Sequence, residues 1–511
     1  MYKQYIMILL AATLFCGCSK FDAINTDPNK TTIVTAEMLA TTLLLDVTKT
    51  TFKSGTDFMR PHMLGKYTCW SSSANEEQYN RLGRTEFFDR LVVLNNIDKM
   101  ISLATSPELK NSYTALGHTL RAWRFFELTM QVGDIPYSQA LKGETEGIIK
   151  PEYDQQKNVF LGILQELDKA DSLFAKGVNF GGDPVYGGNT LKWRKLVNTF
   201  QLKVLINLFR KTADTDLKVI SRFQKIMNGQ PLFEGNEDNF QLKFFDKSGE
   251  KYPFYKEGNQ SYVYIMLSSV IVDSLKLLQD RRLFYYTNPS PVKTEQGMAV
   301  SDWNAYIGLD PSMLYSSLTQ IAGSRNYSTI NDRYLELATG EPIYLLSYAE
   351  LKFMQAEAAV RGWITGDAAT YYNAGVTAAM KFVTDNTPDE ARYHHNMQIT
   401  NDYVQNIYLK QPAVLFSAQP DQQLKQIFQQ KYISTYLQDP GHAFYEYRRT
   451  GYPVFPVNPA SNMNIPSDKI PSRWMYPQKE LDFNSVHLSE AVQHQYGNDD
   501  VNGQMWLLKA N

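Results

Sequence analysis

Apolar residues recur every three or four positions along most of the chain, which places them on one face of an α-helix. Residues 84–104 show the pattern clearly, with Phe87, Leu91, Leu94 and Ile97 in one row. Strand-like alternation is scarce, so the fold class predicted is all-α. The same spacing predicts helices at 36–52, 108–134, 158–177, 191–212, 344–363, 366–383 and 421–438.

Residues 344–383 resemble a tetratricopeptide unit, a pair of antiparallel helices joined by a short turn. Small side chains lie where the two helices would approach, and Gly362 to Gly366 forms the turn. Gly375 lies on the second helix. The other helix pairs are not close copies of this one, so we expect degenerate tetratricopeptide-like hairpins rather than a regular array.

Long stretches without a helical pattern separate the hairpins. Stretches of this length are usually functional when ordered, so we expect them to form ligand-binding loops. The alternative is that some are disordered, but their many aromatic residues argue against it. They span residues 60–83, 228–261, 288–340 and 451–511.

The N-terminus has the layout of a secretory signal, with a charged start, an apolar run from Ile6 to Phe15 and a small residue, Gly17, before Cys18. This layout predicts a lipoprotein in which residues 1–17 are removed and Cys18 is acylated. Several acyl chains on one cysteine give a stable membrane anchor. The alternative is an ordinary signal peptide with incidental cysteines. In the lipoprotein interpretation, residues 18–32 form a lipidated tether and residues 33–511 form one helical body.

The bulk composition is that of a globular protein. The chain has 511 residues, of which 43% are hydrophobic, and a net charge of −2. The absence of a basic excess argues against nucleic acid as a partner. After removal of the signal and acylation of Cys18, only Cys69 remains free, and we expect it to be buried and inert.

Trp70 lies in a polar stretch with no helical pattern. Tyr67 and Tyr79 flank it, with Asn75 and Glu76 between. An aromatic face can stack on the C–H face of a sugar, while amides and carboxylates bind its hydroxyl groups. We therefore predict that these five residues bind ligand, and that Trp70→Ala weakens binding without changing the melting temperature.

A second group, Trp303, Asn304 and Tyr306, has the same mixture of side chains, and Tyr255 belongs to a weaker third patch. The alternative for both tryptophans is that they attach loops to the helical body. By contrast, Trp123 and Trp193 lie on apolar helical stripes and are predicted to be core residues.

Enzyme chemistry has little support in the sequence. Nucleophile elbows, phosphate-binding loops and dinucleotide fingerprints are missing, so no catalytic residue, cofactor or metal is predicted. The adjacent pair His394 and His395 lacks the spacing of a helical zinc site. A surface glycan hydrolase nevertheless remains an alternative. The remaining candidate groups are Glu76 with Glu77, Asp499 with Asp500, and His487 with His494.

Six blocks in order, together with the lipoprotein signal, resemble the SusD/RagB-like outer-membrane lipoproteins of Bacteroidota, and the resemblance spans Cys18 to Trp506. It implies a helical body with a loop-rich, nutrient-binding side. It also implies an outer-membrane, cell-surface location and a SusC-like, TonB-dependent β-barrel transporter as partner. The nutrient implied is an oligosaccharide, with peptide as the alternative. The blocks are "GHTLRAWRFFELTMQVGDIPYSQAL", "LKWRKLVNTFQLKVLINL", "DRRLFYY", "LSYAELKFMQAEAAVRGW", "IFQQKYISTYLQDPGHAFYEYRRTGYP" and "IPSRWMYPQKE".

Overall fold

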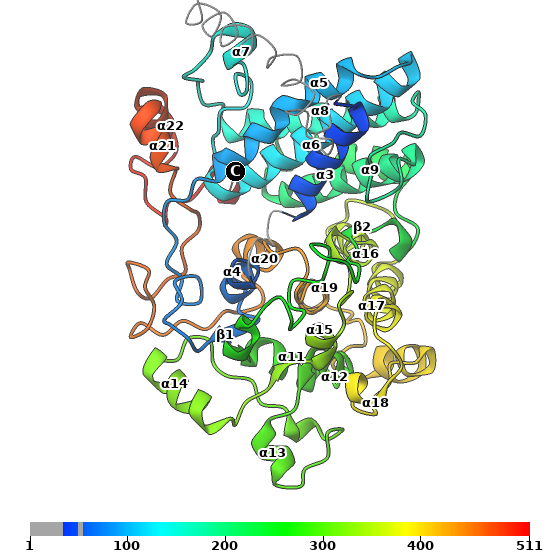
Figure 1. Cartoon of the computed structure of the whole chain (residues 1–511), viewed down its shortest axis with the longest axis vertical. Helices are drawn as coiled ribbons and strands as arrows, with labels where there is room; N and C mark the ends of the chain where they lie inside the picture. The colour runs from blue at the N-terminus through cyan, green and yellow to red at the C-terminus, as the bar shows by residue number, and fades with distance from the viewer. Residues whose placement is uncertain (1–33, 50–54, 511) are drawn as a thin grey trace, which may run out of the picture.

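The structure, a computed structural model, describes residues 34–49 and 55–510. The predicted signal, the lipidation site Cys18 and the tether lie outside the described residues. Two groups of helices are stacked along the long axis of the molecule (Figure 1). The upper group contains α3 (Ala36–Lys49), α5 (Asn96–Ser102), α6 (Pro107–Val132), α8 (Gln156–Phe174), α9 (Thr190–Asn207) and α10 (Val219–Gly229).

The lower group is built around α16 (Tyr348–Val360), α17 (Ala368–Asp385) and α19 (Pro420–Ser434). Shorter helices surround these three. With both groups of helices counted, the described part of the chain is mainly helical, as predicted. The shorter helices are α4 (Gly55–Leu64), α11 (Ser269–Leu277), α12 (Arg282–Tyr286), α13 (Pro291–Glu295), α14 (Tyr315–Ser324), α15 (Asp332–Glu336), α18 (Ala391–His394) and α20 (His442–Thr450). Beside the upper group lie α7 (Gly143–Glu146), α21 (Gln478–Phe483) and α22 (Ser485–Gln495).

Strands occur in the described residues as three two-stranded antiparallel sheets. Each sheet pairs segments that are distant in sequence, so its function is to hold long loops in place. The pairs are β1 (Thr68–Trp70) with β3 (Ile265–Leu267), β2 (Phe240–Leu242) with β6 (Ile343–Leu346), and β4 (Thr287–Asn288) with β5 (Thr329–Ile330).

Helix α6 shows how local sequence sets the ends of a helix. The Ser106 side chain accepts a hydrogen bond from the amide of Leu109, and Pro107 occupies the first turn. The helix ends at Gly133, whose φ is +95°. A Cβ atom there would also lie 2.1 Å from the Gln495 side chain, so Gly133 has a structural role at the end of this helix.

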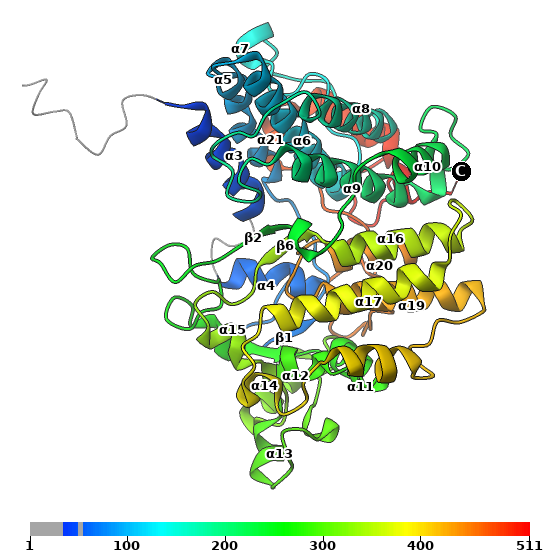
Figure 2. The ribbon, with the colours of Figure 1, turned by 90° about the vertical axis from the view of Figure 1, so that its right-hand side faces the viewer.

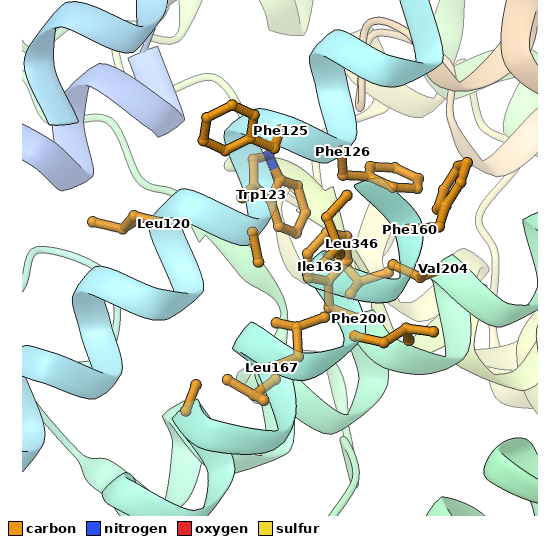
Figure 3. Packing of buried hydrophobic residues seen from close by; sticks show 14 of the residues in the cluster. Leu120, Trp123, Phe125, Phe126, Phe160, Ile163, Leu167, Phe200, Val204 and Leu346 are labelled. Carbon is orange, nitrogen blue, oxygen red and sulfur yellow. The ribbon is translucent and has the colours of Figure 1, made fainter. Parts of the chain in front are cut away.

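The core of the upper group is aromatic and aliphatic. The rings of Trp123 and Phe200 are 4.4 Å apart, and side chains of α6, α8 and α9 meet around them (Figure 3). Trp123 and Trp193 are 4% and 0% exposed, which confirms that both are core residues. Cys69 is also fully buried and unpaired, as predicted.

Helices α16 and α17 form the predicted tetratricopeptide-like hairpin. Gly362 has a φ of +72° in the turn between them. Gly375 of α17 lies so close to α16 that a Cβ atom would be 2.6 Å from the Phe353 ring. A glycine is therefore needed where these two helices are closest.

The two neighbouring arginines of α20 have internal partners. Arg449 donates to Glu357 of α16 at 2.6 Å and to Glu446 at 2.8 Å. Arg448 donates to the carbonyl of Ser472 at 2.8 Å. Both arginines therefore have a structural role inside the protein.

The prediction of irregular structure is wrong in part of two long stretches. Residues 288–340 contain α14, and residues 451–511 contain α21 and α22. These helices are only 6 to 11 residues long. Helices this short have little stability alone, and contacts with the rest of the protein stabilise them.

Candidate functional site

Four irregular segments meet on one side of the lower group, beside β1 and α14 (Figure 1, left). We call this surface the loop face; it comprises residues 71–80, 261–264, 310–315 and 458–465. The amide of Ser71 donates to the Tyr264 carbonyl at 3.0 Å. The Tyr315 hydroxyl donates to the Ser71 carbonyl at 3.0 Å, and the amide of Met463 donates to the Tyr79 carbonyl at 2.8 Å. Hydrogen bonds therefore join segments that are far apart in sequence.

The loop face exposes large apolar side chains. Tyr264 is 42% exposed and Ile465 is 87% exposed. Val263, Leu314 and Met463 are also exposed. An apolar surface with polar groups around it is typical of a binding site. Its exposed polar side chains are Ser72, Ser73, Glu76 and Asp310.

Trp70 lies behind this surface. It ends β1, where it pairs with Ile265, and its side chain is 5% exposed. Its ring centroid is 5.5 Å from that of Tyr264, and its backbone amide donates to the Gln78 side chain at 2.8 Å. These contacts favour the alternative that Trp70 attaches its loop to the body. Its direct contact with ligand stays a prediction.

The two predicted tyrosines near Trp70 are also buried. Tyr67 is stacked on Tyr432 at 4.4 Å, and its hydroxyl donates to the Tyr432 carbonyl. Tyr79 is 2% exposed and donates to the Met313 carbonyl at 3.0 Å. Both tyrosines therefore use their hydroxyl groups to hold segments of the protein together.

Asn75 and Glu76 differ in exposure although they are neighbours. Asn75 is buried and accepts a hydrogen bond from the amide of Gln78 at 2.9 Å, which shapes the loop. Glu76 is exposed and lies 3.4 Å from Arg81. Of these two side chains, Glu76 is the accessible one.

The second predicted group lies on a separate loop. Trp303 is partly buried against Phe284 of α12, with the rings 4.7 Å apart. Tyr306 is fully buried, and its hydroxyl contacts the Val300 carbonyl at 2.7 Å and His395 at 2.9 Å. Asn304 is exposed.

Tyr255 lies on a third loop. It is partly exposed, and the Lys251 ammonium lies 4.6 Å from its ring. The nine predicted residues thus lie in three separate regions, and the group around Trp70 is the one next to the loop face.

Sequence reasoning missed Tyr264, the exposed aromatic residue of the loop face. The signal was present in "SYVYIML", where Tyr262 and Tyr264 alternate just before an apolar strand. Tyr264 precedes β3 directly, so pairing of β3 with β1 places its ring beside Trp70.

The groups that resemble catalytic or metal-binding sites have structural partners. Glu350, Asp439 and His442 are close enough together to bind one cation. However, the Lys203 ammonium lies 2.8 Å from Asp439 and 3.3 Å from Glu350, so a cationic group is already present. Burial also holds the pKa of His442 well below its usual value. These residues therefore do not fit a metal site.

The acids and histidines noted in the sequence also have partners. Asp499 pairs with Arg84 at 2.5 Å and with Arg473 at 2.7 Å. His394 lies 3.1 Å from Asp389, and burial lowers the pKa of His395 to about 4. This arrangement favours a structural role for these groups.

Within residues 34–49 and 55–510, every helix is too short or too polar to cross a bilayer. A helical body that presents aromatic and polar side chains on a face of long loops defines a binding protein. The chain belongs to the SusD-like family described as "Starch-binding associating with outer membrane", which it matches over residues 28–477. This confirms the family predicted from the sequence and its association with the outer membrane.

Solved structures agree with this assignment. A SusD homologue from Bacteroides fragilis is 41% identical, with a TM-score of 0.89, and the match covers 93% of this chain and 100% of that one. A second B. fragilis SusD homologue is 35% identical, with a TM-score of 0.82 and coverage of 94% and 100%. A structure described as a chitin-binding protein is 22% identical, with a TM-score of 0.73 and coverage of 93% and 100%; it shares the fold. No curated protein matches the chain.

Proposed function

We propose that the protein is a lipid-anchored, cell-surface protein that binds an oligosaccharide on its loop face and delivers it to a SusC-like, TonB-dependent transporter. The observation that carries the proposal is the exposed Tyr264 ring, which packs against Trp70 and shares the loop face with the exposed polar residues Ser72, Ser73 and Glu76. A flat apolar surface beside polar groups favours sugar binding, because the ring stacks on C–H groups while the polar groups bind hydroxyls.

The choice of a carbohydrate has two further supports. The family is described as starch-binding, and one protein of the same fold is described as chitin-binding. The loop face is also held by hydrogen bonds between segments, so little conformational entropy is lost when a ligand binds.

The predicted residues take two roles in this proposal. The accessible ones, Glu76, Trp303, Asn304 and Tyr255, contact the ligand or its outer units. The buried ones near Trp70 hold the loops in position behind Tyr264; they are Tyr67, Trp70, Asn75 and Tyr79. Tyr306 is buried in the separate loop that contains Trp303 and holds that loop in place.

Delivery requires release as well as capture. A dissociation constant in the micromolar to millimolar range, about −8 to −4 kcal/mol, suits this task. No covalent step is proposed. The exposed apolar residues Val263, Leu314 and Ile465 give the loop face a surface on which a transporter can pack, so the ligand would pass between the two proteins without entering bulk water.

Calorimetric titration with maltoheptaose and chitohexaose tests the proposal. Tyr264→Ala should weaken binding at least about tenfold, because a central stacking aromatic residue contributes strongly to affinity. The melting temperature should stay the same, since this ring is 42% exposed. Phe483→Ala, which removes an exposed ring on α21, is the matched control and should leave affinity unchanged.

Three results would contradict the proposal in different ways. Unchanged affinity in Tyr264→Ala would remove the loop face as the site. Binding of short peptides in place of both glycans would support the peptide alternative. Release of reducing ends from either glycan by the purified protein would support the hydrolase alternative.

A further inference from the structure

A groove lies along α17, on a side of the lower group that differs from the loop face. Its walls are the turn that contains the 3₁₀ segment Asn236–Asp238, the strand β2 and the start of α16. It encloses about 800 Å³. We call it the α17 groove. In Figure 1 α17 is at the right and α14 at the left, and in Figure 2 α17 faces the viewer, so the groove and the loop face point in different directions.

Helix α17 supplies a regular row of polar side chains to this groove. Asn373, Thr377, Lys381 and Asp385 are four residues apart and therefore lie on one face of the helix. Ala374 also lines the groove, and its small side chain leaves space next to this row. The result is an elongated groove with a small-residue floor and polar walls.

Two amide groups in this groove have free hydrogen-bonding capacity. Asn236 is not one of them, because it donates to the Ala378 carbonyl at 2.9 Å and its Oδ1 atom is buried, so this side chain shapes the wall of the groove. Gln405 donates to Thr377 at 3.0 Å, which leaves its carbonyl oxygen available. The Asn373 side chain has no hydrogen-bond partner among the described residues. The groove therefore offers both donors and acceptors without a net preference for either.

The charges of the groove balance in number. Lys381 pairs with Asp385 at 2.7 Å, and Glu234 pairs with Lys195 at 2.8 Å. The two other charged residues of the lining, Glu237 and Lys243, are exposed and opposite in sign. The ligand that matches these walls is therefore neutral and carries many hydroxyl groups, because one amide can bind adjacent hydroxyls as donor and acceptor.

The aromatic residues of the groove offer little stacking surface. The Lys352 ammonium lies 5.0 Å from the Tyr348 ring, and Phe382 is 7% exposed. Hydrogen bonds must then supply most of the affinity, and each contributes little when water competes. The groove should therefore bind more weakly than the loop face.

We propose that the α17 groove is a second carbohydrate-binding site, which holds another stretch of the polymer whose end or branch is bound at the loop face. This inference rests on the proposed function, because it takes the ligand to be a glycan. A short oligosaccharide occupies one site at a time, whereas a long polymer can bind both. Two weak sites on one polymer raise the overall affinity through effective concentration.

The test separates the two sites with two kinds of groove variant. Asn373→Ala combined with Gln405→Ala removes amides, and Ala374→Arg fills the floor. Electrophoresis through gels that contain soluble starch should show retardation reduced at least threefold for both variants. Calorimetric titration should show maltoheptaose affinity at the loop face within twofold of the unchanged protein. Asn406→Ala, an exposed neighbouring amide that lies outside the groove, is the control and should have no effect.

The outcomes distinguish this inference from the proposed function. If both groove variants are retarded like the unchanged protein while Tyr264→Ala is not retarded, the groove is not a glycan site and the loop face stands. If the groove variants lose retardation while Tyr264→Ala keeps it, the groove stands and the proposed site fails. If starch and glycol chitin both fail to retard the unchanged protein, both proposals fail.

Discussion

At the scale of single residues, buried tyrosines connect distant parts of this protein. The hydroxyl of Tyr344 donates to the Ser434 carbonyl at 2.5 Å, and that of Tyr476 donates to the Asp134 carbonyl at 2.8 Å. A tyrosine combines a large apolar ring with a polar tip, so it can fill a core and satisfy a buried carbonyl together. This explains much of the large number of tyrosines, 32 in the chain.

The burial of Trp70 leads to a prediction about stability. Trp70→Ala should lower the free energy of unfolding by about 3–5 kcal/mol, because the cavity and the lost contacts both destabilise the core. Urea denaturation followed by circular dichroism measures this loss. Tyr264→Ala is the comparison and should change stability little. An unchanged melting temperature in Trp70→Ala would instead agree with the expectation from sequence alone.

Two buried histidines predict sensitivity to acid. Burial lowers the pKa of His62 to about 3 and that of His395 to about 4, from 6.5. The unfolded chain therefore binds more protons below pH 6.5, and stability falls as the pH drops through that value. Each histidine should cost about 2 kcal/mol between pH 6.5 and 5.

Denaturation at several pH values measures this effect. His62→Phe should make the dependence of stability on pH shallower, since the neighbours of this ring are Phe58 and Tyr67 and a phenyl ring has no proton to bind. The same slope in the variant and in the unchanged protein would show that His62 is not responsible.

At the scale of elements, the contact between α16 and α17 depends on a glycine. Gly375→Ala should destabilise the protein by about 1–3 kcal/mol, because its Cβ atom would press on the Phe353 ring. Gly323→Ala in α14 is the matched control, since no atom lies within 4 Å of the added Cβ. It should stabilise the protein by up to about 1 kcal/mol.

Thermal melts of the two glycine variants give this comparison directly. We expect the melting temperature to fall in Gly375→Ala and to rise in Gly323→Ala, although both changes add one methyl group to a helix. A stabilised Gly375→Ala variant would show that the two helices can separate at little cost.

At the scale of the whole molecule, the proposed anchor and transporter would place the proposed binding faces at the membrane. Cys18, which lies outside the described residues, is the proposed lipid attachment point. Cys18→Ala should move the protein from the membrane fraction to the soluble fraction or leave an uncleaved precursor. Cell fractionation and mass spectrometry of the mature N-terminus measure this change. A mature protein that starts at an unmodified residue would refute the anchor.

A SusC-like transporter should remain with the protein after gentle detergent extraction. Stable complexes of this kind bury about 2,000 Å² or more. Cross-linking in native membranes, followed by mass spectrometry, identifies the neighbour. If the cross-linked proteins contain no β-barrel transporter, the proposed delivery of ligand to a transporter is wrong. The proposal that the protein binds a glycan is not affected by this result.

The sequence by itself determined most of the helices and the family, because helical periodicity and capping depend on residues close together in the chain. Ser106, Pro107 and Gly133 define α6 in this way. It also predicted three of the four segments that form the loop face, but the segment that contains Tyr264 lies beyond the end of the predicted stretch 228–261. The core roles of Trp123 and Trp193 followed from the same local pattern.

Only the tertiary structure decided which aromatic residues of the loops are covered. The sequence predicted Trp70 as the accessible aromatic residue and missed Tyr264, yet in the structure, where β1 pairs with β3, Trp70 is buried and Tyr264 is exposed. The α17 groove likewise brings together β2 and α17, which are more than a hundred residues apart. Burial depends on which distant segments meet, and a pattern of neighbouring residues contains no information about that meeting.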